Sequence, residues 1–306
     1  MQALTKDKAL MADIALLIVA IIWGGGFIAG KIALFTMTPF YLLSFRFLCS
    51  GLLLGIIFFK KMKTIDRKSV ISGIILGLSL YIGQTLQTIG LKYTTAGKQA
   101  FLLASYTIIV PFISWIIVKK KPDIYSFFAG LLTLIGIGLL SLQGGLSISY
   151  GDSLSLMFAV VFAFQIVLIG IYVKNINPIH LTTVQLLIAG TLTLISALIF
   201  EPSIKSVTTD AVLSIGYLVI FNTTIAFLVQ NIAQKYTSDT HASIIISLES
   251  VFGFLLSIVL MKEVVTLRMI VGCILIFTAV IVSKTKNRIF NFKHLFKKIH
   301  SPSINE

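Results

Sequence analysis

Long, almost uninterrupted apolar stretches follow one another along this chain, and they leave few folds open to it. Each is about the length that an α-helix needs to cross a bilayer, roughly twenty residues. Lipid offers the backbone no hydrogen-bond partners, so each stretch is predicted to be a helix. With 57% hydrophobic and 12% charged residues, the sequence predicts an all-α integral membrane protein of ten transmembrane helices. The expected helices lie near residues 13–34, 39–59, 70–91, 97–118, 123–142, 153–173, 179–200, 211–233, 240–261 and 265–283.

An internal repeat divides the chain into two similar halves. The stretch LKYTTAGKQAFLLASYTIIVPFISWIIVKKK begins at Leu91, and a similar stretch, QKYTSDTHASIIISLESVFGFLLSIVLMKE, begins at Gln234. A recurrence at a fixed offset indicates duplication of a structural unit. The sequence therefore predicts two five-helix units, at 13–142 and 151–284, followed by a basic tail at 285–306.

The positions of the basic residues predict how the two units are oriented. The formal net charge is +14, and most Lys and Arg residues lie at the ends of apolar stretches. Basic residues gather on the cytoplasmic side of membrane proteins, which places both termini in the cytoplasm and leaves no reason to expect nucleic acid as a partner. Because each unit has an odd number of helices, the second unit enters the membrane upside down. Such inverted repeats are typical of transporters that alternate access around a midplane site.

The tail combines basic residues with apolar ones at helical spacing. Ile289, Phe292, Phe296 and Ile299 recur along one face, and Lys293, Lys297 and Lys298 fall elsewhere. This pattern predicts a short helix on the anionic inner leaflet. A solvated, disordered tail is the alternative.

Two charged residues, Arg46 and Glu249, lie deep within predicted spans. A charge at bilayer depth costs a few kcal/mol or more, so it needs a partner or a function. Arg46 is a candidate clamp for a substrate carboxylate, and Glu249 a candidate proton-coupling acid. In the alternative interpretation the two residues pair, or bond free helix-end carbonyl groups, and only hold the bundle together.

Uncharged polar side chains recur on several of the predicted helices. Amides facing lipid would lack hydrogen-bond partners, so these side chains are expected to face a wet cavity or one another. For any one of them, a hydrogen bond between helices is the alternative. As a set they predict a solute-binding cavity between the two units, lined by Tyr81, Gln84, Gln87, Tyr106, Gln165, Asn222 and Gln230.

Lys98 and its repeat counterpart His241 are expected at opposite entrances to the membrane. Both could line a gate, together with Glu249 as the coupling residue. Anchoring at the membrane interface is the alternative.

Several motifs resemble those of the EamA domains of the drug/metabolite transporter superfamily. The first half carries Trp23-Gly24-Gly25-Gly26-Phe27, then Pro39 with Arg46 seven residues on, and TTAGKQAFL from Thr94. The second half has Pro178 at the start of the seventh helix and a glycine-rich start to the tenth, and the resemblance covers about residues 13 to 284. It implies a bacterial inner-membrane carrier, often an exporter, for amino acids, other metabolites or drugs. We include Trp23 among the predicted solute-binding residues.

The chain departs from the family pattern at two places. Gln185 stands where the repeat would place a counterpart of Arg46, which argues against a symmetric role for the arginine. Ser250-Val251 follows Glu249 where many relatives have proline directly after the acid, so the ninth helix is expected to be straighter.

The sequence as a whole predicts a secondary transporter that exports or exchanges a small organic solute, driven by a proton gradient or by the solute's own gradient. A lipid flippase of the same fold is the alternative. An intramembrane enzyme is a remote one, because the four His residues are scattered and form no HExxH motif. No cofactor or metal is expected, and the expected partners are the solute and the bilayer, for a monomer or a homodimer.

Overall fold

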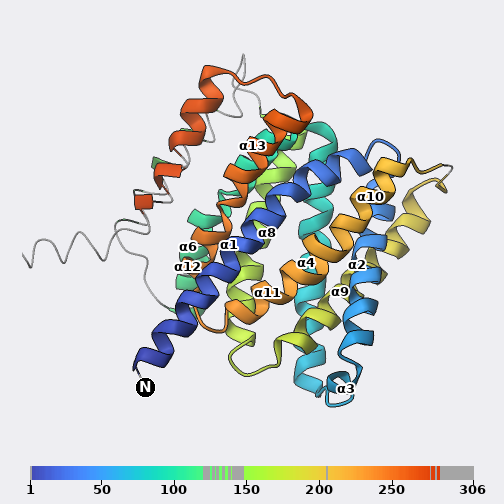
Figure 1. Cartoon of the computed structure of the whole chain (residues 1–306), viewed down its shortest axis with the longest axis vertical. Helices are drawn as coiled ribbons and strands as arrows, with labels where there is room; N and C mark the ends of the chain where they lie inside the picture. Colours follow the sequence, from blue (N-terminus) through green and yellow to red (C-terminus); the bar gives the residue numbers. More distant parts are fainter. Residues whose placement is uncertain are drawn as a thin grey trace, which may run out of the picture.

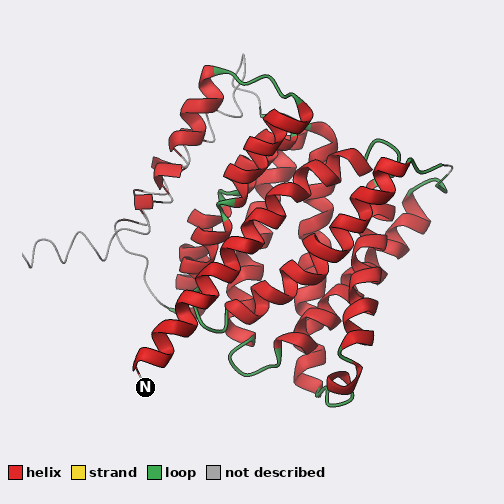
Figure 2. Cartoon of the chain, viewed as in Figure 1, coloured by secondary structure: helices red, strands yellow, loops and turns green. Residues whose placement is uncertain are grey.

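A computed structural model describes most of the chain, and the regular structure in that part is helical (Figures 1 and 2). The described residues are 2–119, 148–204, 206–275, 277–279 and 281–282, with single positions at 125, 128, 131, 132, 135, 136 and 139.

The first half contributes six described helices. In chain order they are α1 (Gln2–Ala33), α2 (Pro39–Ile57), α3 (Phe59–Met62), α4 (Arg67–Tyr93), α5 (Ala96–Leu103) and α6 (Tyr106–Val118).

In the second half, the structure describes six α-helices and one π-helix up to Met261. They are α8 (Tyr150–Tyr172), α9 (Pro178–Phe200), α10 (Thr209–Tyr217), the π-helix η1 (Leu218–Ile225), α11 (Ala226–Ala233), α12 (Asp239–Ile246) and α13 (Glu249–Met261).

Eight helices of the described residues are long and apolar enough to cross a membrane. They coincide, within a few residues at most ends, with eight of the ten predicted stretches; the first helix begins earlier than predicted. A shorter apolar helix, Leu267–Ala279, falls on the predicted stretch 265–283. The stretch 123–142 lies mostly outside the described residues, as does the tail 285–306. The prediction of an all-α membrane protein is confirmed.

Local sequence signals explain where the helices begin. Pro39 and Pro178 each occupy the first turn, where the missing N–H costs nothing. Other helices have a side-chain N-cap: the oxygens of Asp66, Thr95 and Ser238 each accept from a backbone N–H three residues on.

The two spans that carry the repeated motif are interrupted at equivalent places. Ala104-Ser105 separates α5 from α6, and Ser247-Leu248 separates α12 from α13. At both turns the backbone is tightened, since Ser105 N donates to Leu102 O and Leu248 N donates to Ile245 O, three residues back. The missing proline after Glu249 therefore does not keep the ninth span continuous. The two spans also end alike, in left-handed Lys119 (φ 61°) and Lys262 (φ 52°).

Contacts at the helix ends show that the two units are inverted. The ring centroids of Tyr93, at the end of α4, and Tyr150, at the start of α8, are 5.3 Å apart. Lys31, near the end of α1, donates to the carbonyl oxygen of Thr94 at this same end of the bundle (2.7 Å). Thus α8 begins where α1 ends, and the first helices of the two units enter the bundle from opposite ends.

Candidate functional site

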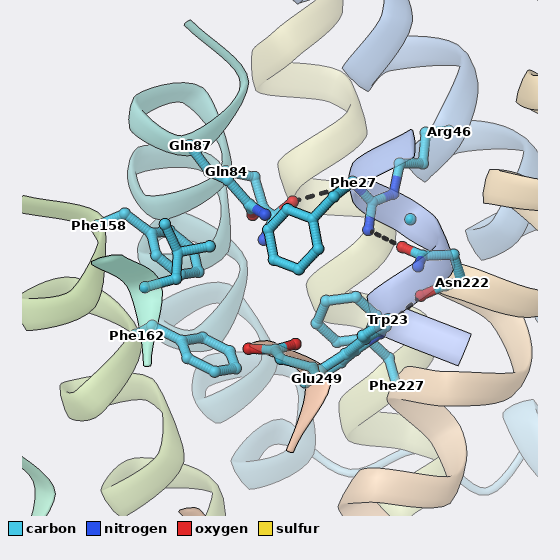
Figure 3. A pocket seen from close by; sticks show the side chains of 12 residues that line it. Trp23, Phe27, Arg46, Gln84, Gln87, Phe158, Phe162, Asn222, Phe227 and Glu249 are labelled. Carbon is cyan, nitrogen blue, oxygen red and sulfur yellow. Dashed lines mark hydrogen bonds between the residues drawn. The ribbon is translucent and has the colours of Figure 1, made fainter. Parts of the chain in front are cut away.

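A cavity in the middle of the bundle is lined by side chains from both units (Figure 3). Ten of its twelve lining residues are buried, and only Gly26 and Gln87 are partly exposed. The cavity is therefore largely closed to the surroundings. Its lining consists of Trp23, Gly26, Phe27, Arg46, Gln84, Gln87, Leu103, Phe158, Phe162, Asn222, Phe227 and Glu249.

Arg46, on α2, lines the cavity and donates hydrogen bonds to three neutral side chains. Its Nε donates to Thr223 Oγ1 (2.6 Å), one terminal nitrogen to Asn222 Oδ1 (2.6 Å) and the other to Gln84 Oε1 (3.1 Å). A guanidinium group has five N–H donors in a rigid fork, so two remain beyond these three bonds. Among the described residues it has no acidic partner within ion-pair distance.

The π-helix η1 supplies two of the three side chains that hold Arg46. Its wider turn is stabilised locally, because Thr224 Oγ1 donates to Val219 O five residues back (2.7 Å). Trp23 Nε1 on α1 donates to the carbonyl oxygen of Asn222 (2.9 Å). A π-turn inside a longer helix frequently marks a functional site. Here it orients Asn222 and Thr223 toward the arginine.

Glu249 lies across the cavity from Arg46, at the first position of α13 (Figure 3). Tyr106 donates its hydroxyl hydrogen to Glu249 Oε1 (3.1 Å), and the two residues are 143 positions apart, the offset of the repeat. Equivalent positions of the two units thus meet at the centre of the molecule. The alternative in which Arg46 and Glu249 neutralise each other directly is wrong, because the arginine bonds neutral oxygens instead.

Aromatic rings line the cavity between Arg46 and Glu249. The Trp23 ring lies 5.7 Å from Phe162 and 5.3 Å from Phe227, and Phe162 stacks on Phe158 at 5.1 Å. The cavity therefore offers one cationic end, one acidic end and an apolar wall.

A second, smaller cavity adjoins the first at Arg46 and extends toward one end of the bundle. It shares Gly26, Phe27, Arg46 and Gln87 with the first and continues to Leu91 on α4. The central cavity is thus extended toward the end of the bundle where α8 begins.

The predicted site residues fall into two groups. Trp23, Arg46, Gln84, Gln87, Asn222 and Glu249 line the central cavity, and Tyr106 reaches it through Glu249. Tyr81 instead shares a hydrogen bond with Ser196 of α9 (2.8 Å), and Gln165 and Gln230 are buried outside the lining. Lys98 and His241 lie at helix starts, each paired with an aspartate.

Sequence reasoning missed the aromatic wall and Thr223. Phe27, Phe158, Phe162 and Phe227 lie in apolar stretches among 23 phenylalanines, so no pattern separated them from lipid-facing residues.

Comparison with known proteins identifies the family. A model of the EamA-like transporter family matches residues 10–142 and again 149–285. The chain belongs to the EamA-like transporter family. It is thus a multi-pass membrane transporter of the drug/metabolite transporter superfamily, a group of transporters and not of enzymes.

Its relatives are similar along most of their length. An uncharacterized transporter of Archaeoglobus fulgidus is 34% identical over 277 residues, covering 90% of this chain and 86% of that protein. The uncharacterized transporter YoaV of Bacillus subtilis is 24% identical over 269 residues, covering 84% and 91%. A crystal structure at 18% identity matches with a TM-score of 0.71, covering 92% of this transporter and 98% of the other chain, which supports the fold.

Proposed function

We propose that this transporter is a secondary carrier that exports or exchanges a small zwitterionic solute with an apolar side chain, such as an amino acid. The observation that carries the proposal is that Arg46, which has no acidic partner among the described residues, lies opposite the carboxyl group of Glu249 in a cavity lined by aromatic rings. A zwitterion has a carboxylate for Arg46 and an ammonium group for Glu249. Its apolar side chain matches the wall formed by Trp23 and the phenylalanines.

Arg46 is suited to bind a carboxylate because two of its five N–H groups have no hydrogen-bond partner among the described residues. Gln84, Asn222 and Thr223 fix the plane of the guanidinium without cancelling its charge. A fixed fork binds a planar carboxylate in two-point fashion, which a lysine cannot reproduce.

Glu249 provides the coupling in this proposal. An ammonium group and a proton compete for the same carboxylate, so the solute binds when the proton leaves and the proton binds when the solute leaves. A proton gradient then drives the solute in the opposite direction.

The buried lining of the cavity favours a water-soluble solute over a lipid. A flippase of the same fold would need a cavity that opens sideways to the bilayer. Ten of the twelve lining residues are instead buried within the bundle.

The first experiment is transport by purified protein in liposomes. Labelled amino acids, nucleobases, organic cations and a fluorescent lipid are offered with and without a pH gradient. We expect accumulation of an apolar amino acid that depends on the gradient. Transport of the lipid or of a cation instead would contradict the proposal.

Binding measurements with three analogues then test the contacts of each end of the solute separately. Phenylalanine carries both charges. Its analogue 3-phenylpropanoate carries only the carboxylate, and phenethylamine carries only the ammonium group. Arg46→Lys should weaken binding of the first two by about ten- to hundredfold, the equivalent of about 1.5–3 kcal/mol. Glu249→Gln should weaken the first and third and leave 3-phenylpropanoate unchanged.

A matched control is Tyr81→Phe, which removes a polar group outside the cavity lining and should leave all three affinities unchanged. Equal effects of Arg46→Lys on the acid and the amine would rule out a carboxylate site at Arg46.

We propose that the two units extend over 13–142 and 151–284 and lie in the inner cell membrane, with both termini in the cytoplasm. The tail 285–306 would bind anionic lipid, and the carrier would act as a monomer or a homodimer.

A further inference from the structure

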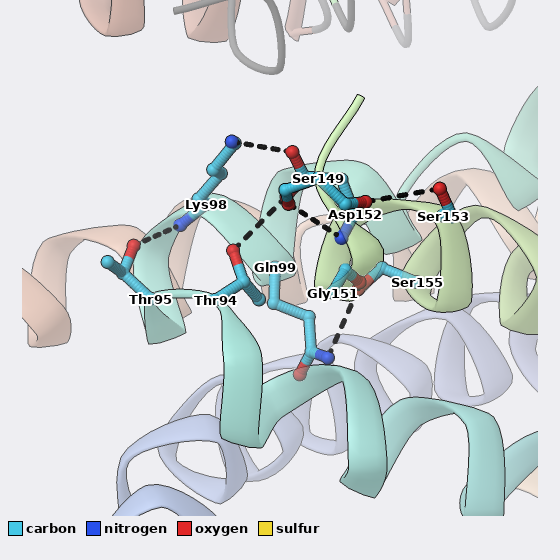
Figure 4. Close-up of polar contacts among 9 residues, drawn as sticks. All are labelled: Thr94, Thr95, Lys98, Gln99, Ser149, Gly151, Asp152, Ser153 and Ser155. Carbon is cyan, nitrogen blue, oxygen red and sulfur yellow. Dashed lines mark hydrogen bonds and ion pairs between the residues drawn. The ribbon is translucent and has the colours of Figure 1, made fainter. Parts of the chain in front are cut away.

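A buried ion pair joins the two units at the end of the bundle where α8 begins (Figure 4). Lys98 Nζ, in the first turn of α5, lies 2.6 Å from Asp152 Oδ2 in the first turn of α8. The side chain of Asp152 is 0% exposed and that of Lys98 13%. Asp152 also accepts from Thr94 Oγ1 (3.2 Å), so its carboxylate is tied to the connection between α4 and α5.

A second contact, between a histidine and an aspartate, joins the two units at the opposite end. His241 Nε2, in the first turn of α12, lies 3.0 Å from Asp13 Oδ2 on α1. Both side chains are about one-third exposed. Like the first pair, it links a helix start in one unit to the first helix of the other.

The two pairs occupy equivalent positions of the repeat. Lys98 and His241 are 143 positions apart, as are Tyr106 and Glu249. Residues 10 and 149 open the two family matches, 139 positions apart, and Asp13 and Asp152 have the same separation. The chain therefore makes the same contact twice, once at each end of the bundle.

The basic member of each pair, Lys98 or His241, lies on a short helical segment that ends at a tightened turn beside the cavity. The segment α5 ends before Ala104-Ser105, and α12 ends before Ser247-Leu248. Tyr106 follows Lys98 by eight positions, and Glu249 follows His241 by eight positions. If α5 moves about its turn, Tyr106 is displaced with it. If α12 moves about its turn, Glu249 is displaced.

We propose that Lys98–Asp152 and His241–Asp13 are the two gates of the transport cycle, opened in alternation. Each pair holds the interrupted helix of one unit against the first helix of the other. In this structure both pairs are formed, in agreement with the buried lining of the cavity. The proposal concerns access to the cavity and is independent of which solute is carried.

The two gates differ in what lies between them and the cavity. Behind Lys98–Asp152, the second cavity leads from Arg46 to Leu91, next to the Thr94 connection. Behind His241–Asp13, α1 and α12 present a buried apolar layer that includes Leu16, Val19, Ile245 and Ile246. Breaking the first pair should therefore be enough to open the cavity, whereas breaking the second also requires the apolar layer to part.

The test measures access to the cavity from each face. The two free cysteines, Cys49 and Cys273, are replaced by serine, and a single cysteine is placed in the cavity lining by Leu103→Cys. A membrane-impermeant thiol reagent is then added to right-side-out or inverted vesicles, and the labelling rate is measured.

Asp152→Asn should raise labelling from the Lys98 face by about five- to tenfold and should not raise it from the other face. An effect of this size is at the low end of typical allosteric coupling. Asp13→Asn should raise labelling only from the His241 face, and by less. The exchange Lys98→Asp with Asp152→Lys should return the rate toward that of the parent. If Asp152→Asn fails to reach the membrane, Lys98→Gln breaks the same pair.

Two carboxylates outside the gates provide controls. Glu201, on the Lys98 face, accepts from the backbone N–H groups of Phe40 and Tyr41 at the start of α2. Asp66, on the His241 face, caps its own helix. Glu201→Gln and Asp66→Asn should leave labelling unchanged. Unchanged labelling in Asp152→Asn, an equal rise from both faces, or a double exchange that stays as open as the single variant would overturn the proposal.

Discussion

Arg46 illustrates how single residues in this transporter depend on support from the backbone. Its partners Asn222 and Thr223 are correctly oriented only while η1 keeps its wider turn. That turn is tied to α1 through the hydrogen bond from Trp23 Nε1 to the carbonyl oxygen of Asn222. The indole N–H therefore stabilises the site although it does not contact the arginine.

Trp23→Phe tests this support. It removes the N–H and with it the hydrogen bond to the carbonyl oxygen of Asn222, at a cost of about 0.5–1.5 kcal/mol. We expect a lower apparent Tm of the purified protein and weaker solute binding. Trp115→Phe is the control, since Trp115 is 41% exposed on α6 and should tolerate the change. Equal Tm values for the two variants would contradict the role given to Trp23.

At the residue scale, the charged and amide residues of the site could be predicted from the sequence, but their hydrogen-bond partners could not. Arg46 and Glu249 were visible because charge is rare in apolar stretches. The oxygens that hold Arg46 come from helices far apart in sequence, and Asn222 and Thr223 reach it through a π-turn that has no clear sequence pattern. Tyr81 shared a helical face with Gln84, yet its hydroxyl group bonds to Ser196 on α9.

At the scale of helices, the close packing of α1 against α13 requires glycine at position 24. A Cβ atom added at Gly24 would lie 2.6 Å from the Cβ of Phe252 and 2.9 Å from the backbone nitrogen of Gly253. Such contacts cannot be relieved by rotating a side chain, because the second involves the backbone. The two helices would have to separate.

Gly24→Ala should therefore destabilise the protein by about 1–3 kcal/mol, the usual range for overpacking. Gly216→Ala on α10 is the matched control, since a Cβ there meets nothing within 4 Å. Alanine favours a helix interior over glycine by about 0.5–1 kcal/mol, so this variant should be neutral or more stable. Chemical unfolding of both variants in detergent measures the difference. A Gly24→Ala protein as stable as the Gly216→Ala protein would contradict the close approach of α1 and α13.

The helices themselves were largely predictable, because the thickness of the bilayer sets their length and the backbone in lipid must form all its hydrogen bonds internally. The repeat also placed α5 and α12 in equivalent positions. The gates could be half predicted: Lys98 and His241 stood out through the 143-residue offset, but their aspartates did not. Asp13 and Asp152 are related by a different offset, since the connections between the helices of the two units differ in length.

At the scale of the whole molecule, basic residues are unequally divided between the two ends of the bundle. The end with the His241–Asp13 pair has most of those in the described connections and helix ends, including Lys60, Lys61, Lys63, Arg67, Lys68, Lys119, Lys174 and Lys235. The opposite end has fewer, including Lys31, Lys92, Lys98, Lys262 and Arg268. The positive-inside rule therefore predicts that the first end faces the cytoplasm.

Single cysteines test this orientation in intact cells. Lys63 precedes α4 at the end with more basic residues, and Ser203 follows α9 at the other end; both are exposed. In a protein without Cys49 and Cys273, an impermeant thiol reagent added outside should label Ser203→Cys and leave Lys63→Cys unlabelled until the cells are opened. The reverse pattern would turn the molecule over in the membrane, and the Lys98–Asp152 gate would then face the cytoplasm. The gating proposal would survive that result, because it rests on the relation between the two ends and not on which compartment each one faces.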